Sequence, residues 1–444
     1  MKELSVRQSI CSYQAFSEIE MLTARVFRHS LLAFGLLLCS SSILLGQQPA
    51  EPNAQNNAAD NALNVYKELM TPEEAISFQK TKQRDFDELL RGGKINGAED
   101  KKLIAEGARY YLYLMTLKQD PKKPENETDL NKLRANILRD IQFSGRVSGN
   151  FQARELYLEE LTKRAEDLLD NHRLVRFSAV VLLSQLDLRD EDRRKKIDRV
   201  AYTMAYVPLI KVLNDKTQPT ELKIVAANGL ARIGQTGNAT NQLRIKIAEE
   251  IIDELIPSVN EYSWYQRSLV EALGSLGITD NLARRPIVTD ALLNVMGDPK
   301  RTWEVRSTAA LNIGKLPLKA NADIKLITYS IVDMTRKMVQ AYNANTAGYW
   351  WKRCFWNVYL AFKPANAADN TGLVKQQVNQ TVVNDAYKQV IKPIATIVQP
   401  GETPKINADV TKEMDDWLKE KLPKNFRVAP VQAKPQNQQV AEGK

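Results

Sequence analysis

The sequence predicts an all-α fold made of repeated helix pairs. Apolar residues recur at helical spacing through most of the chain, and one pattern of them returns at intervals of 47, 43 and 40 residues. Only 19 glycines and 18 prolines serve 444 residues, which is too few for the many turns of a β architecture. The apolar content of 43% is that of a globular protein.

Composition and charge narrow the possible functions. The net charge is +9, but the cations are not gathered into the stripe that nucleic-acid-binding proteins present, so we expect no nucleic-acid partner. Beyond residue 46 the chain has one histidine, His172, and one cysteine, Cys354. This excludes zinc sites built from several His and Cys ligands. No cofactor is expected, because neither a glycine-rich nucleotide loop nor a nucleophile elbow occurs.

Residues 1–46 are predicted to be a leader and signal peptide. Arg25 and Arg28 precede 31–45, an uncharged apolar run that is short of the about 20 residues of a membrane-spanning helix. We expect export to a periplasmic or extracellular location. Two alternatives stay open, namely an uncleaved anchor through 31–45, which alone would bring membrane contact, and a lipoprotein that uses Cys39. The polar stretches 47–62 and 424–444 are predicted to be a disordered linker and tail.

Residues 63–150 are predicted to form an N-terminal helical cap. Thr71-Pro72-Glu73-Glu74 is a strong helix start, in which threonine and Glu74 complete a capping box. Gly92-Gly93 ends that helical segment, and further helices are expected over 100–118 and 130–141. We find no repeat in this segment.

Residues 151–364 carry the repeat. Four helices end on the buried positions Leu186, Ile233, Leu276 and Leu316, and each has apolar residues three and seven positions earlier, on the same helix face. Gly234 and Gly277 follow at positions that suit a left-handed helix cap. An apolar helix precedes each of these four, over 156–169, 206–213, 247–259 and 286–296. None of these units can bury its apolar face alone.

The turns between paired helices resemble those of the HEAT repeat, a member of the armadillo-like group. The residues that match the family pattern are Asp170 with Val175-Arg176, Asp215 with Leu222-Lys223, and Asp298 with Val305-Arg306, together with Pro208, Pro257 and Pro286 in the first helices. The third unit departs, with Asn260 in the turn and Gln266-Arg267 in the second helix. The resemblance implies a right-handed α-solenoid of about five HEAT-like helix-turn-helix repeats with helical caps at both ends.

The end of the array is predicted from weaker signals. A degenerate fifth unit comprises a long helix over 324–342 and an aromatic helix over 348–364. Two helices in 365–423, the first interrupted by Pro393, are expected to form a C-terminal helical cap.

The aromatic helix supplies the candidate binding surface. Trp351, Phe355 and Phe362 share one face and are expected in the core, whereas Trp350 and Trp356, with Lys352 and Arg353, are the candidate interface residues. A second set recurs once per unit and should line up along the array: Asp170, Arg176, Asp215, Lys223, Arg267, Asp298 and Arg306. The resemblance implies a structural ladder for this set, and an anionic-ligand ladder is the alternative.

The isolated reactive side chains have ordinary explanations. His172 lies beside the Asp170-Asn171 turn, where a helix-capping histidine is common, and Cys354 lies on the apolar face of the aromatic helix, where a buried inert thiol is expected. We therefore expect no enzyme but an exported repeat scaffold that binds a protein or another cell-envelope component. The alternatives are a carbohydrate-acting enzyme on an α/α toroid, which needs acidic and aromatic residues meeting at the centre of a closed ring, and a nucleic-acid-binding HEAT protein.

Overall fold

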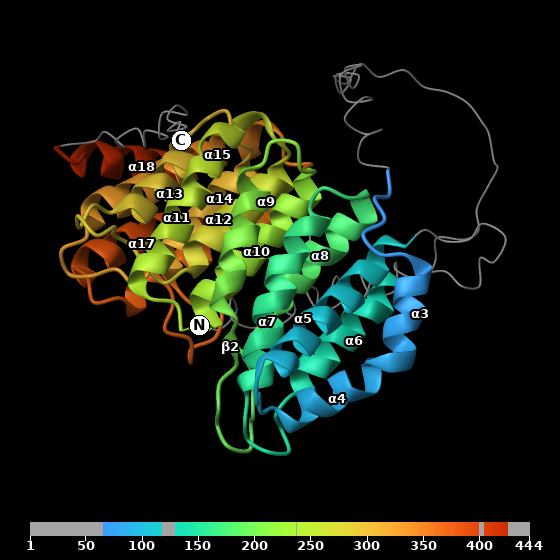
Figure 1. The fold of residues 1–444 in the computed structure, drawn as a ribbon. Helices are drawn as coiled ribbons and strands as arrows, with labels where there is room; N and C mark the ends of the chain where they lie inside the picture. The colour runs from blue at the N-terminus through green and yellow to red at the C-terminus, as the bar shows by residue number, and fades with distance from the viewer. Residues whose placement is uncertain (1–64, 118–128, 237, 399–403, 425–444) are drawn as a thin grey trace, which may run out of the picture.

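The fold is all-α, and its helices pack in sequential pairs. The computed structural model describes residues 65–117, 129–236, 238–398 and 404–424, so the predicted signal peptide, linker and most of the tail lie outside the described residues. The chain advances from α3 at one end to α18 at the other (Figure 1). The N-terminal helices are α3 (Pro72–Thr81), α4 (Gln83–Gly92), α5 (Ala98–Tyr113) and α6 (Leu130–Phe143).

Five helix pairs follow. They are α7 (Gln152–Ala165) with α8 (Arg173–Gln185), α9 (Tyr206–Asn214) with α10 (Thr220–Thr236), α11 (Asn241–Leu255) with α12 (Ser263–Ser275), α13 (Ile287–Gly297) with α14 (Trp303–Lys315), and α15 (Ile324–Ala344) with α16 (Trp351–Phe362). The last helices are α17 (Gln380–Ile397) and α18 (Ala408–Glu420). Short 3-10 segments are η2 (Leu114–Thr116), η4 (Glu166–Leu168), η5 (Thr203–Ala205), η6 (Pro257–Asn260) and η7 (Leu373–Lys375).

The helix pairs build two rows. The second helices pack in the order α6, α8, α10, α12, α14 and α16, which we call the inner row. The first helices form the other row, in which α5 packs on α7, α9 on α11, α11 on α13 and α13 on α15. Both rows therefore begin with α5 and α6, in the segment where the sequence shows no repeat.

Buried stripes on the inner row confirm the predicted helix faces. The stripe residues that end the four repeat helices are at most 2% exposed, and so are the residues three and seven positions before them. Each buried leucine or isoleucine stabilises the fold by about 1.5–3 kcal/mol. Small residues bring the last three helices of the inner row close together, because a Cβ on Gly274 would meet Asn312 and one on Gly314 would meet the backbone of Ala361.

Helix ends follow the sequence signals with two corrections. The capping box at Thr71 is present, and Gly93 and Gly277 adopt left-handed φ angles of 73° and 68°. Gly234, however, lies inside α10, where a Cβ would come within 2.5 Å of Leu276 Cδ2, so it serves close packing and not a cap. Pro393 does not interrupt α17, because packing against α15 and α16 outweighs one lost backbone hydrogen bond.

A short β-hairpin between α8 and α9 was not predicted. Strands β1 (Asp187–Arg189) and β2 (Val200–Ala201) pair antiparallel. Arg154 holds the hairpin to α7 through an ion pair with Asp190, 3.0 Å from Nη1 to Oδ2. Its tip carries the cations of 193–196, a dense local run that the charge argument overlooked. Such a short, charged hairpin lacks the alternating apolar pattern from which strands are predicted.

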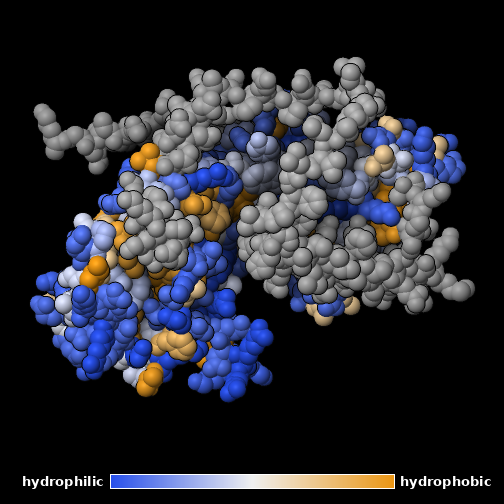
Figure 2. Space-filling model, turned by 90° about the vertical axis from the view of Figure 1, so that its right-hand side faces the viewer, coloured by the Kyte–Doolittle hydropathy of each residue, from blue (hydrophilic) through white to orange (hydrophobic). Residues whose placement is uncertain are grey.

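No helix within the described ranges combines the length and apolar character needed to cross a membrane. On the face drawn in Figure 2, hydrophilic residues predominate and hydrophobic residues appear in separate groups.

Candidate binding groove

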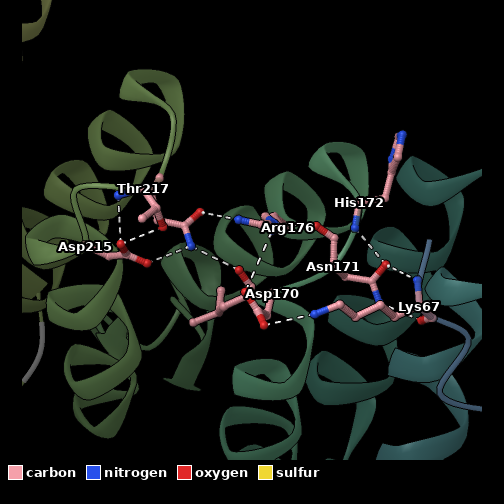
Figure 3. A network of polar contacts seen from close by, with 9 residues as sticks. Lys67, Asp170, Asn171, His172, Arg176, Asp215 and Thr217 are labelled. Atoms are coloured by element: carbon pink, nitrogen blue, oxygen red, sulfur yellow. Dashed lines mark hydrogen bonds and ion pairs between the residues drawn. The ribbon is translucent and has the colours of Figure 1, made fainter. Parts of the chain in front are cut away.

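The repeated polar residues form hydrogen-bonded joints between neighbouring turns. At the joint between α8 and α10, buried Arg176 donates through Nε to the carbonyl of Asn171 and through Nη1 to Gln218 Oε1 at 3.4 Å (Figure 3). Asp170 lies 3.9 Å from Arg176 Nη2 and accepts a 3.0 Å hydrogen bond from Lys67 Nζ. The bond from Lys67 is the main reason that the pKa of Asp170 is lowered. This joint therefore ties the segment before α3 to two neighbouring helix pairs.

Gln218 is a joint residue that the sequence analysis missed. It donates through Nε2 to the carbonyl of Leu169 at 3.0 Å and to Asp215 Oδ2 at 3.2 Å. Asp215 also accepts from the backbone N–H and the hydroxyl of Thr217, within its own turn (Figure 3). A signal for Gln218 exists, because it lies three residues after the turn aspartate, as Arg301 lies three residues after Asp298.

The joint between α12 and α14 uses the same two residue types in exchanged places. Gln266, and not Arg267, stands ten residues before the stripe end, where the other units have Arg176, Lys223 or Arg306. Arg301 donates to Gln266 Oε1 at 2.6 Å and to the carbonyls of Leu255 and Ile256, both at 2.9 Å. One joint thus pairs Arg176 with Gln218, and the other pairs Gln266 with Arg301.

The remaining ladder residues also bind their own protein. Lys223 donates to Glu254 Oε1 at 2.8 Å, and Asp298 lies 3.4 Å from Arg301 Nε. Arg306 donates through Nε to the carbonyl of Met296 at 2.8 Å, and its guanidinium lies 4.1 Å from the centre of the Trp303 ring. Apart from Arg267, the cations of the ladder are therefore buried and occupied by structural contacts.

His172 and Cys354 show no sign of reactivity. The Nδ1 atom of His172 accepts from the Leu174 amide at 3.3 Å and so caps α8, and its ring stacks on Tyr66 at 4.0 Å. Burial raises the pKa of the Cys354 thiol to about 12, so the thiol is protonated at neutral pH.

Several apolar side chains of α8, α10 and α12 lie wholly or partly exposed on the surface of the inner row. Leu174 on α8 and Trp264 on α12 each lie two residues before the buried joint residue of their helix, and Phe177 and Ile224 each lie one residue after it. Trp264 is 40% exposed and Phe177 37%, and Tyr262 stacks on Trp264 at 5.7 Å. Leu174 and Phe177 line one cavity and Ile224 and Trp264 line another, so the side chains form two apolar patches on the row.

Two cavities lie on this face, which we call the groove. The first, of about 320 Å³, is lined by six residues of α10 and α12 and by one of α16: Glu221, Ile224, Trp264, Arg267, Ser268, Glu271 and Arg353. The second, of about 400 Å³, lies between α6 and α8 and includes Leu130, Arg134, Leu174 and Phe177. An ion pair between Arg173 and Glu221 bridges α8 and α10 between the cavities.

Charge in the first cavity is concentrated on α12 and α16. Arg267 and Arg353 come together there although 86 residues separate them in sequence. The buried Nε of Arg267 makes no hydrogen bond among the described residues. Lys315 lies near Glu271, and burial lowers the pKa of its ammonium group. A ligand carboxylate could supply the acceptor that Arg267 lacks.

The four candidate interface residues separate in the structure. Arg353 is exposed and lines the first cavity. Trp350 and Trp356 are half-buried, the latter stacked on Tyr359 at 4.7 Å, and Lys352 is half-buried as well. The most exposed aromatic of this region is Tyr349, at 89%. Helical spacing places residues on a face but does not say which neighbouring helix covers it.

Comparison of the chain with family models, with curated proteins and with solved structures returned no match. Within the described part of the chain, no three His, Cys, Asp or Glu side chains are grouped so as to hold a metal ion.

Proposed function

We propose that the chain is an exported, non-catalytic scaffold with the architecture of a right-handed α-solenoid of HEAT-like repeats. Its partner is a protein of the cell envelope, of which an extended segment lies along the groove. Sequential helix pairs and the residues of the polar joints support the repeat architecture. The predicted signal in residues 1–46 supports export.

The observation that carries the proposal is the first cavity of the groove. It combines the exposed Trp264 ring and the apolar Ile224 with two guanidinium groups, of which Arg267 has an unused buried donor. Tryptophan and arginine are the residues that concentrate binding energy at protein interfaces. An extended polypeptide can place apolar side chains on the apolar residues of the two cavities. It can also place a carboxylate between Arg267 and Arg353.

Site-specific crosslinking tests this function. A photoreactive residue in place of Ser268, inside the first cavity, should capture an envelope protein, and the same residue in place of Tyr349 should not. A peptide covering the captured segment should then bind wild-type protein, and Trp264→Ala should weaken it by about tenfold or more. Trp350→Ala/Trp356→Ala is the matched control, and an equal loss in that control would move the site to the aromatic helix.

A carbohydrate-acting enzyme is the second candidate, because Glu221 and Glu271 line the same cavity as Trp264. The toroid that this activity requires is not supported, since α3 and α18 lie at opposite ends of the molecule (Figure 1). Hydrolysis or cleavage of an envelope polysaccharide that is abolished by Glu221→Gln and by Glu271→Gln would establish this function in place of the scaffold.

A further inference from the structure

A cavity of about 440 Å³ lies at the N-terminal end of the molecule, outside the groove. It is enclosed by α4, α5, α6 and the loop that follows α6, at the opposite end of α6 from the second groove cavity. Its lining carries two carboxylates, Asp87 and Asp140, and the guanidinium groups of Arg91 and Arg139. Nothing in the proposed scaffold function uses this cavity.

The two carboxylates come from different helices and lie close enough to repel each other. Asp140 on α6 lies 3.8 Å from Arg139 Nε. The charges of Arg91 and Asp87 on α4 also act on its carboxylate. Burial is the largest cause that raises the pKa of Asp140, to about 6, and the charge of Asp87 raises it further. Burial likewise raises the pKa of Asp87. The attraction of Arg91 and Arg139 lowers both pKa values but does not offset this loss of hydration.

Two buried hydroxyl groups, one in the cavity lining and one outside it, have no hydrogen-bond partner among the described residues. Ser144 lines the cavity and is 1% exposed, and its Oγ makes no hydrogen bond. Tyr157 on α7 is fully buried, and its Oη makes none either. Burial is the main cause that raises the pKa of the Tyr157 hydroxyl, and the charges of Asp140 and Asp87 raise it further, although Tyr157 is not among the residues that line the cavity. Buried polar groups are nearly always hydrogen-bonded, so these two require a partner.

We propose that this cavity binds a small zwitterion with a primary ammonium group, a carboxylate and an apolar side chain, which is the chemistry of a free amino acid. The ammonium group has three N–H donors, and the carboxylates of Asp87 and Asp140 together with the Ser144 hydroxyl, all in the cavity lining, supply three acceptors. The ligand carboxylate then accepts from the guanidinium of Arg139 or Arg91.

Other ligand classes fit the lining less well. A simple anion would be repelled by both carboxylates. A simple cation would be repelled by the three arginines of the lining, Arg91, Arg139 and Arg146. A zwitterion leaves the charge of the cavity unchanged. The apolar part of the ligand has Leu90 and Phe143 as neighbours, both of which line the cavity.

Calorimetric titration with three matched probes tests the assignment. L-leucine carries both charges, L-leucinamide lacks the carboxylate as a polypeptide amino terminus does, and 4-methylpentanoate lacks the ammonium group. We expect L-leucine to bind wild-type protein in the millimolar range or better, and each of the other probes to bind about tenfold or more weakly. Absence of L-leucine binding to protein with an intact helical spectrum, or equal binding of all three probes, would overturn the proposal.

Two variants separate a ligand site from a structural one. Asp140→Asn should weaken L-leucine binding by about tenfold, and Ser144→Ala by about threefold without loss of folding. Asp416→Asn, on the exposed face of α18, is the matched control and should bind as wild type does. Wild-type affinity should also fall as the pH is lowered through about 6, where Asp140 takes up a proton. Unchanged affinity in Asp140→Asn would show that L-leucine is not held by this carboxylate and would overturn the proposal.

Discussion

The polar joints of the inner row and the N-terminal cavity both bury charged and hydroxyl groups, but they treat them differently. At the joints most donors meet acceptors, as where Arg301 reaches Gln266 and two main-chain carbonyls, although its Nε has only the ion pair with Asp298 at 3.4 Å. The hydroxyls of Ser144, in the cavity lining, and of Tyr157 meet no acceptor or donor among the described residues. A satisfied buried group stabilises the fold, whereas an unsatisfied one costs stability and is available to a ligand. The joints are thus structural, and the cavity is a candidate site.

Removal of Arg301 should give the largest effect. Arg301→Met deletes three hydrogen bonds and leaves the Gln266 Oε1 and two carbonyls without that donor, so we expect the free energy of unfolding to fall by about 3 kcal/mol. Urea unfolding followed by circular dichroism measures it. Arg353→Met, an exposed arginine of the groove, is the control and should change stability by less than about 0.5 kcal/mol.

Exchanging one joint for the other should give the second largest effect. Arg176→Gln alone should cost about 2 kcal/mol, because Gln218 and the Asn171 carbonyl lose a charged donor. Adding Gln218→Arg recreates the order seen at Gln266 and Arg301, so the double variant should recover to within about 1 kcal/mol of wild type. Additive losses in this double-mutant cycle would show that the two joints are not equivalent.

The carboxylate of Asp140 should respond in the opposite direction. Its pKa is about 6 in the folded protein against an ordinary 3.8, so the ionised form is disfavoured by folding and stability is lost as the pH rises through this window. Solvent screens part of this charge, so we expect Asp140→Asn to stabilise the protein by only about 1 kcal/mol at pH 7. The difference from wild type should vanish near pH 4, which paired unfolding curves at the two pH values would show.

Tyrosine hydroxyls give the smallest and most direct contrast. Tyr157→Phe removes an unsatisfied hydroxyl, so the free energy of unfolding should stay equal or rise by up to about 1 kcal/mol. Tyr265→Phe removes a hydroxyl that donates to Glu254 at 2.6 Å and should lower it by about 1 kcal/mol or more. A loss for Tyr157→Phe as large as that for Tyr265→Phe would mean that the Tyr157 hydroxyl already has a structural partner.

Much of the fold was accessible to sequence reasoning because it depends on local chemistry. The capping box at Thr71 and the left-handed Gly277 follow from neighbouring residues, and both are present. The buried stripes follow from the 3.6-residue period, and Trp351, Phe355 and Phe362 are buried as predicted. The period also places Gln266 at the ladder position, although the family pattern drew attention to Arg267.

The candidate site was less accessible, because it consists of contacts between distant segments. Arg353 on α16 meets Arg267 on α12 in the first cavity although 86 residues separate them, and no pattern within one helix contains that contact. The partners of Gln218 and Arg301 lie on preceding units, and a single helix pattern contains no information about them. The unpartnered hydroxyls of Ser144 and Tyr157 gave no signal in sequence at all.

The sequence by itself determined the helices, the faces they bury and the period at which the pairs recur, because these depend on residues within one or two turns of each other. The tertiary structure alone decided which cations form hydrogen bonds within the joints and which line the first cavity. It also created the groove and the N-terminal cavity. The physical reason is that burial and hydrogen-bond satisfaction are properties of packed neighbours, and in this chain those neighbours are commonly 35 to 100 residues apart.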